Sequence, residues 1–345
     1  MLNIAFIYIV LLFIVMRFSV TVFNFLSNPK LGLYGRHFSD PVSVIIEMTE
    51  NSDGLNDLLS SLQRQDYQQI EVLIQHHPQT TVDQRILNIC ANDARFQLLE
   101  RGEDSSNITE AAAGKYLLFL RDNTIVNNGL INSLIYRTKV FNLSLLTVIP
   151  TQTIEGAAAY CLRPLDNFVL LNLVPLRLVR LVSSPVFSAG SNQCMFFKAD
   201  DYSGFNWQRR ADGKITDGLE VVKAVKQEGF NVDTLLGSKM LYSTSPESGR
   251  LLFLKTGKRL LRGFGNNNFA ALLYLLVVVA GPIIMLFNYE YSLLILPAGL
   301  IFLSRVMISF LSRQQPLWNI LLHPIQMLAL TAALLVAMYE RLSVK

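Results

Sequence analysis

The chain has 345 residues, of which 51% are hydrophobic and 16% are charged, and its formal net charge at pH 7 is +4. This composition is too apolar for an ordinary soluble domain, and the charge is too small to indicate a nucleic-acid partner. Three cysteines are too few, and odd in number, for a disulfide framework, and they suit reduced cytosolic thiols.

The apolar residues are concentrated at the two ends of the chain. They form stretches over residues 2–26, 269–287, 291–311 and 317–339, each about the 20 residues that a membrane-spanning helix needs. The first stretch has no basic region before it and no small-residue cleavage site after it, so we expect an uncleaved anchor over residues 1–28. Lysine and arginine follow the first stretch and precede the second. The positive-inside rule therefore places the region between them in the cytosol, against a bacterial-type inner membrane.

The region between the ends alternates strand and helix patterns. Strands are expected over residues 42–46, 70–74, 95–99 and 115–120, and helices over 54–65, 82–91 and 106–113. This alternation predicts βαβ units and a parallel sheet. Farther on, a helix over 165–182 has a large apolar face with arginine at its margin, which fits a membrane-interface helix or an ordinary core-facing helix equally well. Residues 249–263 indicate an interface helix more strongly, because they run directly into an apolar stretch.

A polar cluster follows the strand expected over residues 115–120. The sequence there is KYLLFLRDNT, which places Arg121, Asp122 and Asn123 at the C-terminal end of the strand. Open parallel sheets bind their ligands just beyond the carboxyl ends of the strands. We therefore expect the chemistry of this chain at these three residues.

Several segments together resemble the family 2 glycosyltransferases of the GT-A fold. They are SLQRQDY at 61–67, IEV at 70–72, SAGSNQCMFF at 188–197, YSGF at 202–205 and ITDGLE at 215–220. The resemblance covers residues 40–265 and implies a GT-A-like α/β domain with a mixed sheet flanked by helices. The expected organisation is an anchor over 1–28, the GT-A-like cytosolic domain over 40–248, an amphipathic interface helix over 249–265 and three transmembrane helices over 266–345.

The donor site that the resemblance implies is degenerate. By their positions in the family's motifs, its residues are Glu50, His77, Arg121, Asp122 and Asn123, but the carboxylates that usually hold a metal and a nucleotide diphosphate are replaced at two places. We assign no metal ligand, although Mg²⁺ or Mn²⁺ stays an open alternative. Arg121 either binds phosphate directly, as a guanidinium can, or fills the vacated acidic pocket and pairs with Glu50 or Asp217. Asp122 is either a metal ligand or a solvated loop residue or helix cap.

The acceptor side that the resemblance implies is better preserved. Asp217 stands where the family has its general base, yet an aspartate at a helix start is also favoured by capping alone. Gly190 and Ser191 correspond to an acceptor-facing loop, although a glycine in a turn needs no function. Arg259 and Arg262 partly resemble an acceptor motif of the family, without its tryptophan.

Two functions fit this pattern. The first is a membrane-bound glycosyltransferase that moves a sugar from a UDP- or GDP-linked nucleotide sugar to a lipid-like or polysaccharide acceptor. The second is a catalytically inactive relative that serves as a scaffold or regulatory partner of another membrane enzyme. The survival of Asp217 favours the first, and the missing carboxylates favour the second.

Overall fold

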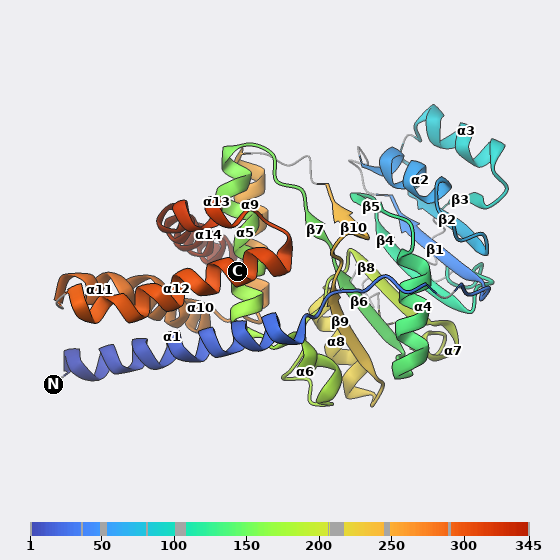
Figure 1. Ribbon diagram of the computed structural model, residues 1–345. Helices are drawn as coiled ribbons and strands as arrows, with labels where there is room; N and C mark the ends of the chain where they lie inside the picture. The colour runs from blue at the N-terminus through green and yellow to red at the C-terminus, as the bar shows by residue number, and fades with distance from the viewer. Residues whose placement is uncertain are drawn as a thin grey trace. The chain divides into compact units, whose positions relative to one another are not determined.

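The computed structural model describes residues 2–35, 37–48, 54–80, 82–100, 108–205, 207, 217–244, 249–288 and 291–343 (Figure 1). The chain divides into two compact units. An α/β unit comprises Pro29–Thr153 and Leu176–Pro246, and a helical unit comprises Met1–Asn28, Ile154–Pro175 and Glu247–Lys345.

The α/β unit contains a mixed sheet of seven strands. Their order is β3 (Phe96–Glu100), β2 (Ile70–His76), β1 (Val42–Glu47), β4 (Tyr116–Arg121), β8 (Cys194–Lys198), β6 (Leu145–Ile149) and β9 (Val232–Leu236). The first four are parallel to one another, and β8 runs antiparallel to both β4 and β6. A smaller sheet has the order β5 (Thr124–Val126), β10 (Leu241–Ser243) and β7 (Thr151–Gln152). The expected parallel strands are thus confirmed.

The strands are buried because helices cover the large sheet. These helices are α2 (Leu55–Gln63), α3 (Gln84–Asn92), α4 (Leu130–Phe141), α6 (Leu176–Leu181), α7 (Ala199–Tyr202) and α8 (Gly218–Gln227). In β1, five consecutive residues are buried, as expected for an inner strand of a covered parallel sheet. Helix α2 buries the leucines whose spacing predicted it, namely Leu55, Leu58, Leu59 and Leu62.

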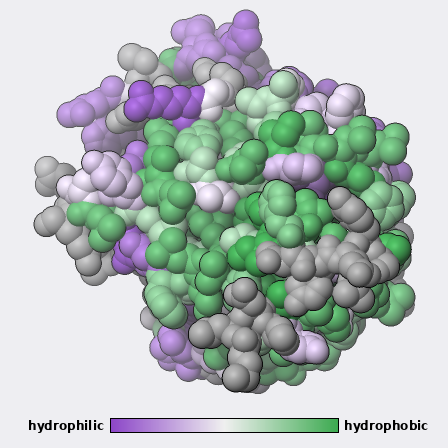
Figure 2. Space-filling model, turned by 90° about the vertical axis from the view of Figure 1, so that its left-hand side faces the viewer, coloured by the Kyte–Doolittle hydropathy of each residue, from purple (hydrophilic) through white to green (hydrophobic). Residues whose placement is uncertain are grey.

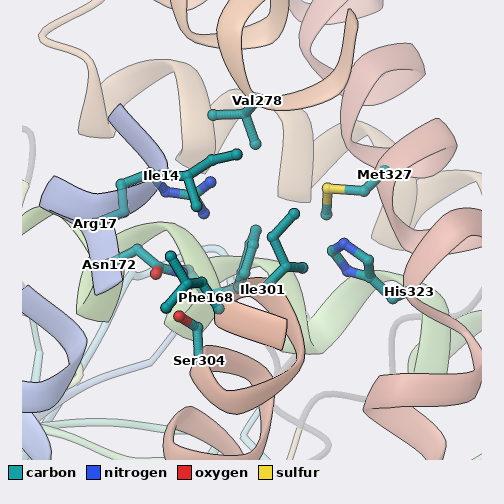
Figure 3. A pocket seen from close by; sticks show the side chains of 10 residues that line it. Ile14, Arg17, Phe168, Asn172, Val278, Ile301, Ser304, His323 and Met327 are labelled. Atoms are coloured by element: carbon teal, nitrogen blue, oxygen red, sulfur yellow. The ribbon is translucent and has the colours of Figure 1, made fainter. Parts of the chain in front are cut away.

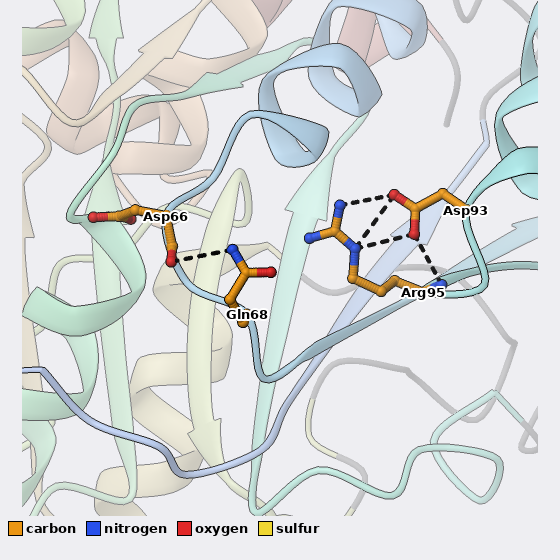
Figure 4. Close-up of polar contacts among 4 residues, drawn as sticks. All are labelled: Asp66, Gln68, Asp93 and Arg95. Atoms are coloured by element: carbon orange, nitrogen blue, oxygen red, sulfur yellow. Dashed lines mark hydrogen bonds and ion pairs between the residues drawn. The ribbon is translucent and has the colours of Figure 1, made fainter.

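The turn from α3 to β3 is fixed by local polar contacts. Asp93 Oδ2 lies 2.7 Å from Arg95 Nη2, and Asp93 Oδ1 accepts a hydrogen bond from the Arg95 backbone N–H at 3.1 Å (Figure 4). Figure 4 also shows Gln68 Nε2 donating to the backbone oxygen of Asp66 at 3.5 Å, in the loop that leads into β2. These contacts orient two neighbouring strands at the N-terminal edge of the sheet, opposite the edge where ligands are expected.

Two predicted helices differ in the structure. Residues 108–113 form a turn and an irregular segment, while 101–107 lie outside the described residues. The Ala113 N–H donates to Glu71 Oε1 and the Gly114 N–H to Ser43 Oγ, both at 2.7 Å, so side chains of β1 and β2 take backbone groups that a continuing helix would use. The helix predicted over 165–182 is divided into α5 (Ala157–Leu173) and α6 by Pro175, which lacks an N–H and keeps Val174 extended.

The helical unit contains four helices that are long and apolar enough to span a membrane. These spans are Ala5–Ser27, Asn268–Phe287, Leu294–Ser312 and His323–Ser343. The first span belongs to α1 (Leu2–Ser27), the third to α12 (Tyr291–Ser312) and the fourth to α14 (His323–Ser343). The second span is formed by three consecutive elements, namely α10 (Asn268–Leu275), η1 (Leu276–Ala280) and α11 (Gly281–Asn288). The last span begins later than the predicted residue 317, because Pro316–Leu321 forms a separate short helix, α13.

Two further helices of this unit run across the spans. Helices α5 and α9 (Gly249–Gly263) lie across the direction of α1, α10 and α12 (Figure 1). Large apolar side chains remain exposed on the spans, among them Tyr8, Leu12, Leu272, Ile295 and Leu328. Figure 2 shows hydrophobic residues covering most of the visible face. Contiguous apolar surface of this kind marks contact with a membrane or a partner.

Candidate functional site

The carboxyl ends of the parallel strands bring several polar residues to one edge of the large sheet. In register, Glu47 at the end of β1 pairs with Gln75 of β2 on one side and with Arg121 of β4 on the other. Asp122 and Asn123 follow Arg121 directly. His77 follows β2, which is two strands from β4 and therefore about 10 Å away across the sheet.

The start of β8 lies beside the end of β4, because the two strands are antiparallel. Cys194 pairs with Leu120, and the Arg121 N–H donates to the Gln193 backbone oxygen at 3.1 Å. The side chain of Gln193 continues the contact, since its Nε2 donates to Ser243 Oγ at 2.8 Å and to Asn123 Oδ1 at 3.5 Å. The predicted donor residues Arg121 and Asn123 are thus held against the segment that leads into β8.

Two glycines bring this segment against the start of α8. A Cβ on Gly190 would lie 2.5 Å from the Gly218 backbone oxygen, and a Cβ on Gly218 would lie 2.5 Å from the carbonyl carbon of Ser191. Both approaches involve backbone atoms, so only glycine fits at either position. Asp217 precedes Gly218. The structure therefore brings Asp217, Gly190 and Ser191 together, next to the residues that adjoin the end of β4.

Asp217 is the N-cap residue of α8. Its Oδ1 accepts a hydrogen bond from the Leu219 N–H at 3.1 Å, and its backbone is extended, as in a typical cap. The capping role predicted from the sequence is confirmed. The role of Asp217 as a general base stays a prediction.

Arg121 has no ion pair with Asp217. Within the described residues no carboxylate lies at ion-pair distance from its guanidinium. The other predicted partner, Glu50, lies outside the described residues. The pairing of Arg121 with Asp217, one of the alternatives drawn from the sequence, is therefore wrong.

Asp122 is buried, with 7% of its surface exposed, so its interpretation as a solvated loop residue is also wrong. It does not cap the next helix either, because the N-cap of α4 is Gly129. A Cβ on Gly54 would lie 2.8 Å from the Asp122 backbone oxygen. The loop after β4 thus packs against the start of α2.

Lys226, which the sequence analysis did not single out, fixes the segment ahead of Gly190. Its Nζ donates to the backbone oxygens of Val182 at 2.9 Å and Phe187 at 2.5 Å, and burial lowers the pKa of this lysine to about 8. Helix α8 therefore contacts the segment both at its start, through Gly218, and in its last turn. The available signal was the place of Lys226 on the apolar face of α8, four residues after Val222.

The described residues do not form a metal site of the usual kind. Among them, no group of three His, Cys, Asp or Glu side chains is close enough to hold an ion. His77 Nδ1 instead accepts a hydrogen bond from the Gln79 N–H at 3.3 Å. Glu47 and Asp122 are carboxylates at or next to the strand ends, but two ligands do not make a cage for Mg²⁺ or Mn²⁺. The donor set thus does not fit a metal held by the described residues alone.

The other predicted acceptor-side residues, Arg259 and Arg262, lie on α9 in the helical unit. Arg259 Nη2 is 2.9 Å from Asp166 Oδ2 on α5, and Arg262 Nε donates to the Lys258 backbone oxygen at 3.3 Å. Arg259 therefore joins the two helices that cross the spans. Its role toward an acceptor stays a prediction.

Comparisons with known proteins agree with this architecture. No protein-family model and no curated protein matches the sequence. Among solved structures, the mannosyltransferase PcManGT from Pyrobaculum calidifontis, in complex with GDP-Man and Mn²⁺, is similar with a TM-score of 0.56 and 12% identity, over 97% of this chain and 99% of that one. TarS 1–349 from S. aureus, in complex with UDP-GlcNAc, has a TM-score of 0.41 and 11% identity, over 86% of this chain and 89% of that one. The chain therefore has the glycosyltransferase fold of the GT-A-like type predicted from its sequence, together with four helices long and apolar enough to span a membrane.

Proposed function

We propose that the chain is a membrane-bound glycosyltransferase that moves a sugar from a UDP- or GDP-linked nucleotide sugar to a lipid-like or polysaccharide acceptor. The observation that carries this proposal is the grouping of Asp217, Gly190 and Ser191 with Arg121 and Asn123 at the carboxyl edge of the sheet. PcManGT, which shares the fold, was determined with a nucleotide sugar, and this supports the same class of donor here.

In this proposal Arg121 binds the diphosphate of the donor. The guanidinium has no carboxylate partner among the described residues, and its planar donors match phosphate oxygens in pairs. It would stabilise the charge that develops on the leaving diphosphate, which a metal usually neutralises. Asn123 and Asp122, beside it, and His77 and Glu50, after β2 and β1, would orient the nucleotide.

Asp217 is the proposed base. As the acceptor hydroxyl oxygen attacks the anomeric carbon of the sugar, its proton passes to the Asp217 carboxylate, and the bond from carbon to diphosphate breaks with its electron pair going to the diphosphate. Oδ1 keeps its hydrogen bond to the Leu219 N–H, which fixes the carboxylate. Gly190 and Ser191, which pack against the start of α8, would lie beside the bound acceptor.

We also propose the membrane placement that the charge pattern indicates. The four apolar helices support integration in a bacterial-type inner membrane. Lysine and arginine on both sides of the α/β unit in the sequence support a cytosolic position for that unit. Arg259 and Arg262, on a helix that crosses the spans, would face a lipid-like acceptor.

A second function is favoured by one specific observation. The carboxylates expected at two places are replaced, and the described residues offer no three-ligand metal cluster. A catalytically inactive scaffold or regulatory partner of a membrane enzyme would need neither.

Calorimetric titration separates the two functions. The detergent-purified chain is titrated with GDP, UDP, GDP-mannose and UDP-GlcNAc, each with Mn²⁺ and with a chelator. We expect a dissociation constant between micromolar and low millimolar that survives chelation, and at least tenfold weaker binding for Arg121→Gln. The matched control is Arg85→Gln, which changes an exposed arginine of α3 in the same unit. Binding that requires the metal refutes the role of Arg121, and a folded chain that binds none of the four supports the scaffold.

A further inference from the structure

The helical unit buries two arginines inside its membrane-spanning segments. Arg17 of α1 has 6% of its surface exposed, and Arg305 of α12 has 2%. Both lie within spans, over Ala5–Ser27 and Leu294–Ser312. Ionisable residues at such positions are costly and usually mark a functional site with a defined partner.

The contacts of both arginines are aromatic or neutral. The Cζ atoms of Arg17 and Arg305 lie 4.9 Å and 3.6 Å from the centroid of the same ring, that of Phe168 on α5. Arg305 Nε donates to His323 Nδ1 at 2.8 Å. A ring nitrogen that accepts a hydrogen bond carries no proton, so His323 is neutral and does not compensate the charge of Arg305.

No counter-charge reaches the two guanidiniums from the residues that the structure describes. None of these residues has a carboxylate at ion-pair distance from Arg17 or Arg305. Arg17 Nε and Arg305 Nη2 are buried and, among the described residues, have no hydrogen-bond partner. Two uncompensated charges over one ring repel each other and have lost much of their hydration, so an anion bound to them would stabilise both.

A small cavity adjoins Arg17. It has a volume of about 20 Å³ and is lined by Arg17, Asn172, Ser304 and His323 together with apolar side chains. Figure 3 shows the side chains of Arg17, Ser304 and His323 arranged around one space, with Phe168 among them. This volume holds about one water molecule. A phosphate group is larger than this volume, so its binding requires side chains of the lining, such as Ile301 and Met327, to move.

Arg17 and Arg305 adjoin α5, the helix that crosses the spans. Helix α5 crosses the C-terminal third of α1, where Thr21 Oγ1 donates to Asn172 Oδ1 at 2.9 Å and Asn24 Nδ2 donates to the Leu171 backbone oxygen at 2.9 Å. Arg17 lies four residues, about 6 Å, from Thr21 along α1. Both guanidiniums lie over the ring of Phe168 on α5, so a position of α5 in the membrane interface would bring them close to the lipid head groups.

We propose that Arg17 and Arg305 bind the phosphate group of a lipid whose acyl chains lie along the spans. Each guanidinium can donate two parallel hydrogen bonds to phosphate oxygens, and the phosphate supplies the missing negative charge. This proposal requires the spans to lie in a membrane but does not depend on glycosyl transfer. It assigns a site within the helical unit, apart from the edge of the sheet.

Native mass spectrometry of the full chain, released from a neutral detergent, tests the proposal. The probes are dioleoyl phosphatidic acid and dioleoylglycerol, which have the same acyl chains with and without the phosphate. We expect at least tenfold greater retention of phosphatidic acid. Arg17→Gln and Arg305→Gln should each lower that retention at least tenfold, whereas Arg250→Gln, an exposed arginine of α9, should not. Equal retention of the two lipids by the unmodified chain, or unchanged retention in both glutamine variants, overturns the proposal.

Two further arms complete the design. Inorganic phosphate is added as a competitor, and displacement of phosphatidic acid at equal concentration would mean that the site takes free phosphate, which overturns the assignment to a lipid. If the glutamine variants fail to give a monodisperse chain, Arg17→Lys and Arg305→Lys keep the charge but lose the paired donors. Weaker but detectable retention in these variants supports the proposal, and retention equal to that of the unmodified chain refutes the role of the guanidiniums.

Discussion

Substitution of Asp217 separates its two roles, because asparagine keeps a hydrogen-bond acceptor while alanine does not. The Oδ1 atom caps α8 through the Leu219 N–H at 3.1 Å. In Asp217→Asn the amide oxygen can make the same bond, while the interaction of the charge with the helix N-terminus, worth about 0.3–1 kcal/mol, is lost. In Asp217→Ala the cap is lost as well, at about 1 kcal/mol more. We therefore expect the alanine variant to be the less stable of the two.

The effect on sugar transfer should follow the carboxylate and not the cap. A general base contributes about 10²–10⁴-fold to a rate, so both variants should lose activity by about this factor although only one loses the cap. The measurements are chemical denaturation and initial transfer rates of the full chain in detergent. Asp83 is the matched control, since its Oδ1 caps α3 through the Arg85 N–H at 3.1 Å and no catalytic role is proposed for it. Transfer by Asp217→Asn at the unmodified rate would refute the role as a base, and equal stability of the two variants would refute the capping argument.

Three further predictions concern the α/β unit. Gly218→Ala should lower the free energy of unfolding by about 1–3 kcal/mol, because the new methyl group meets backbone atoms. Gly204→Ala should not, because a methyl group there meets nothing within 4 Å, and similar denaturation midpoints for the two variants would contradict the close packing at Gly218. Arg137→Gln should cost about 1.5–3 kcal/mol, since fully buried Asp233 loses the guanidinium 2.7 Å away but keeps Arg180 Nε at 3.6 Å from the same oxygen; a loss below 1 kcal/mol in denaturant would show that Arg180 alone compensates the charge. Burial lowers the pKa of Lys226 to about 8, below the ordinary value of about 10.4. Between these two pH values the unfolded chain binds more protons than the folded chain, so the free energy of unfolding should rise with pH. This rise should vanish in Lys226→Met, and a rise that persists in the variant would assign it to another group.

Much of the α/β unit could be predicted because its signals are local. The β-branched run that forms β1 and the leucine spacing of α2 are readable within about ten residues each, and both elements are present. The failure over residues 108–113 has a different origin. The N–H groups of Ala113 and Gly114 bind side chains of Glu71 and Ser43, which are far away in sequence. No periodic pattern contains that information.

The break at Pro175 had a local signal, because proline excludes the preceding residue from a helix. The amphipathic pattern on both sides of it is continuous, and this continuity favoured one helix over 165–182. The structure shows that the two halves pack in different units, α5 with the spans and α6 with β9. Similar apolar faces can thus serve two different cores, and the pattern does not say which.

At the candidate site, the sequence indicated the edge of the sheet but not its contacts. The rule for parallel strands correctly drew attention to Arg121, Asp122 and Asn123, all of which lie at the end of β4. The contact between Gly190 and Gly218 could not be foreseen, because the glycines are 28 residues apart and their role depends on the paths of β8 and α8. The burial of Asp122 likewise depends on the neighbouring loop at Gly54.

Both proposed ligands are anions, one at the edge of the sheet and the other among the spans. Arg121 at the sheet edge and Arg17 with Arg305 among the spans are arginines without a carboxylate partner among the described residues, and each set is assigned an anion that would supply the missing charge. The ligands differ, so the outcomes are independent. Binding of a nucleotide diphosphate and of a lipid phosphate would indicate a transferase that also holds a charged lipid. Lipid binding without nucleotide binding would indicate that the glycosyltransferase fold serves as a membrane scaffold, because the helical unit would then be the only one with a ligand.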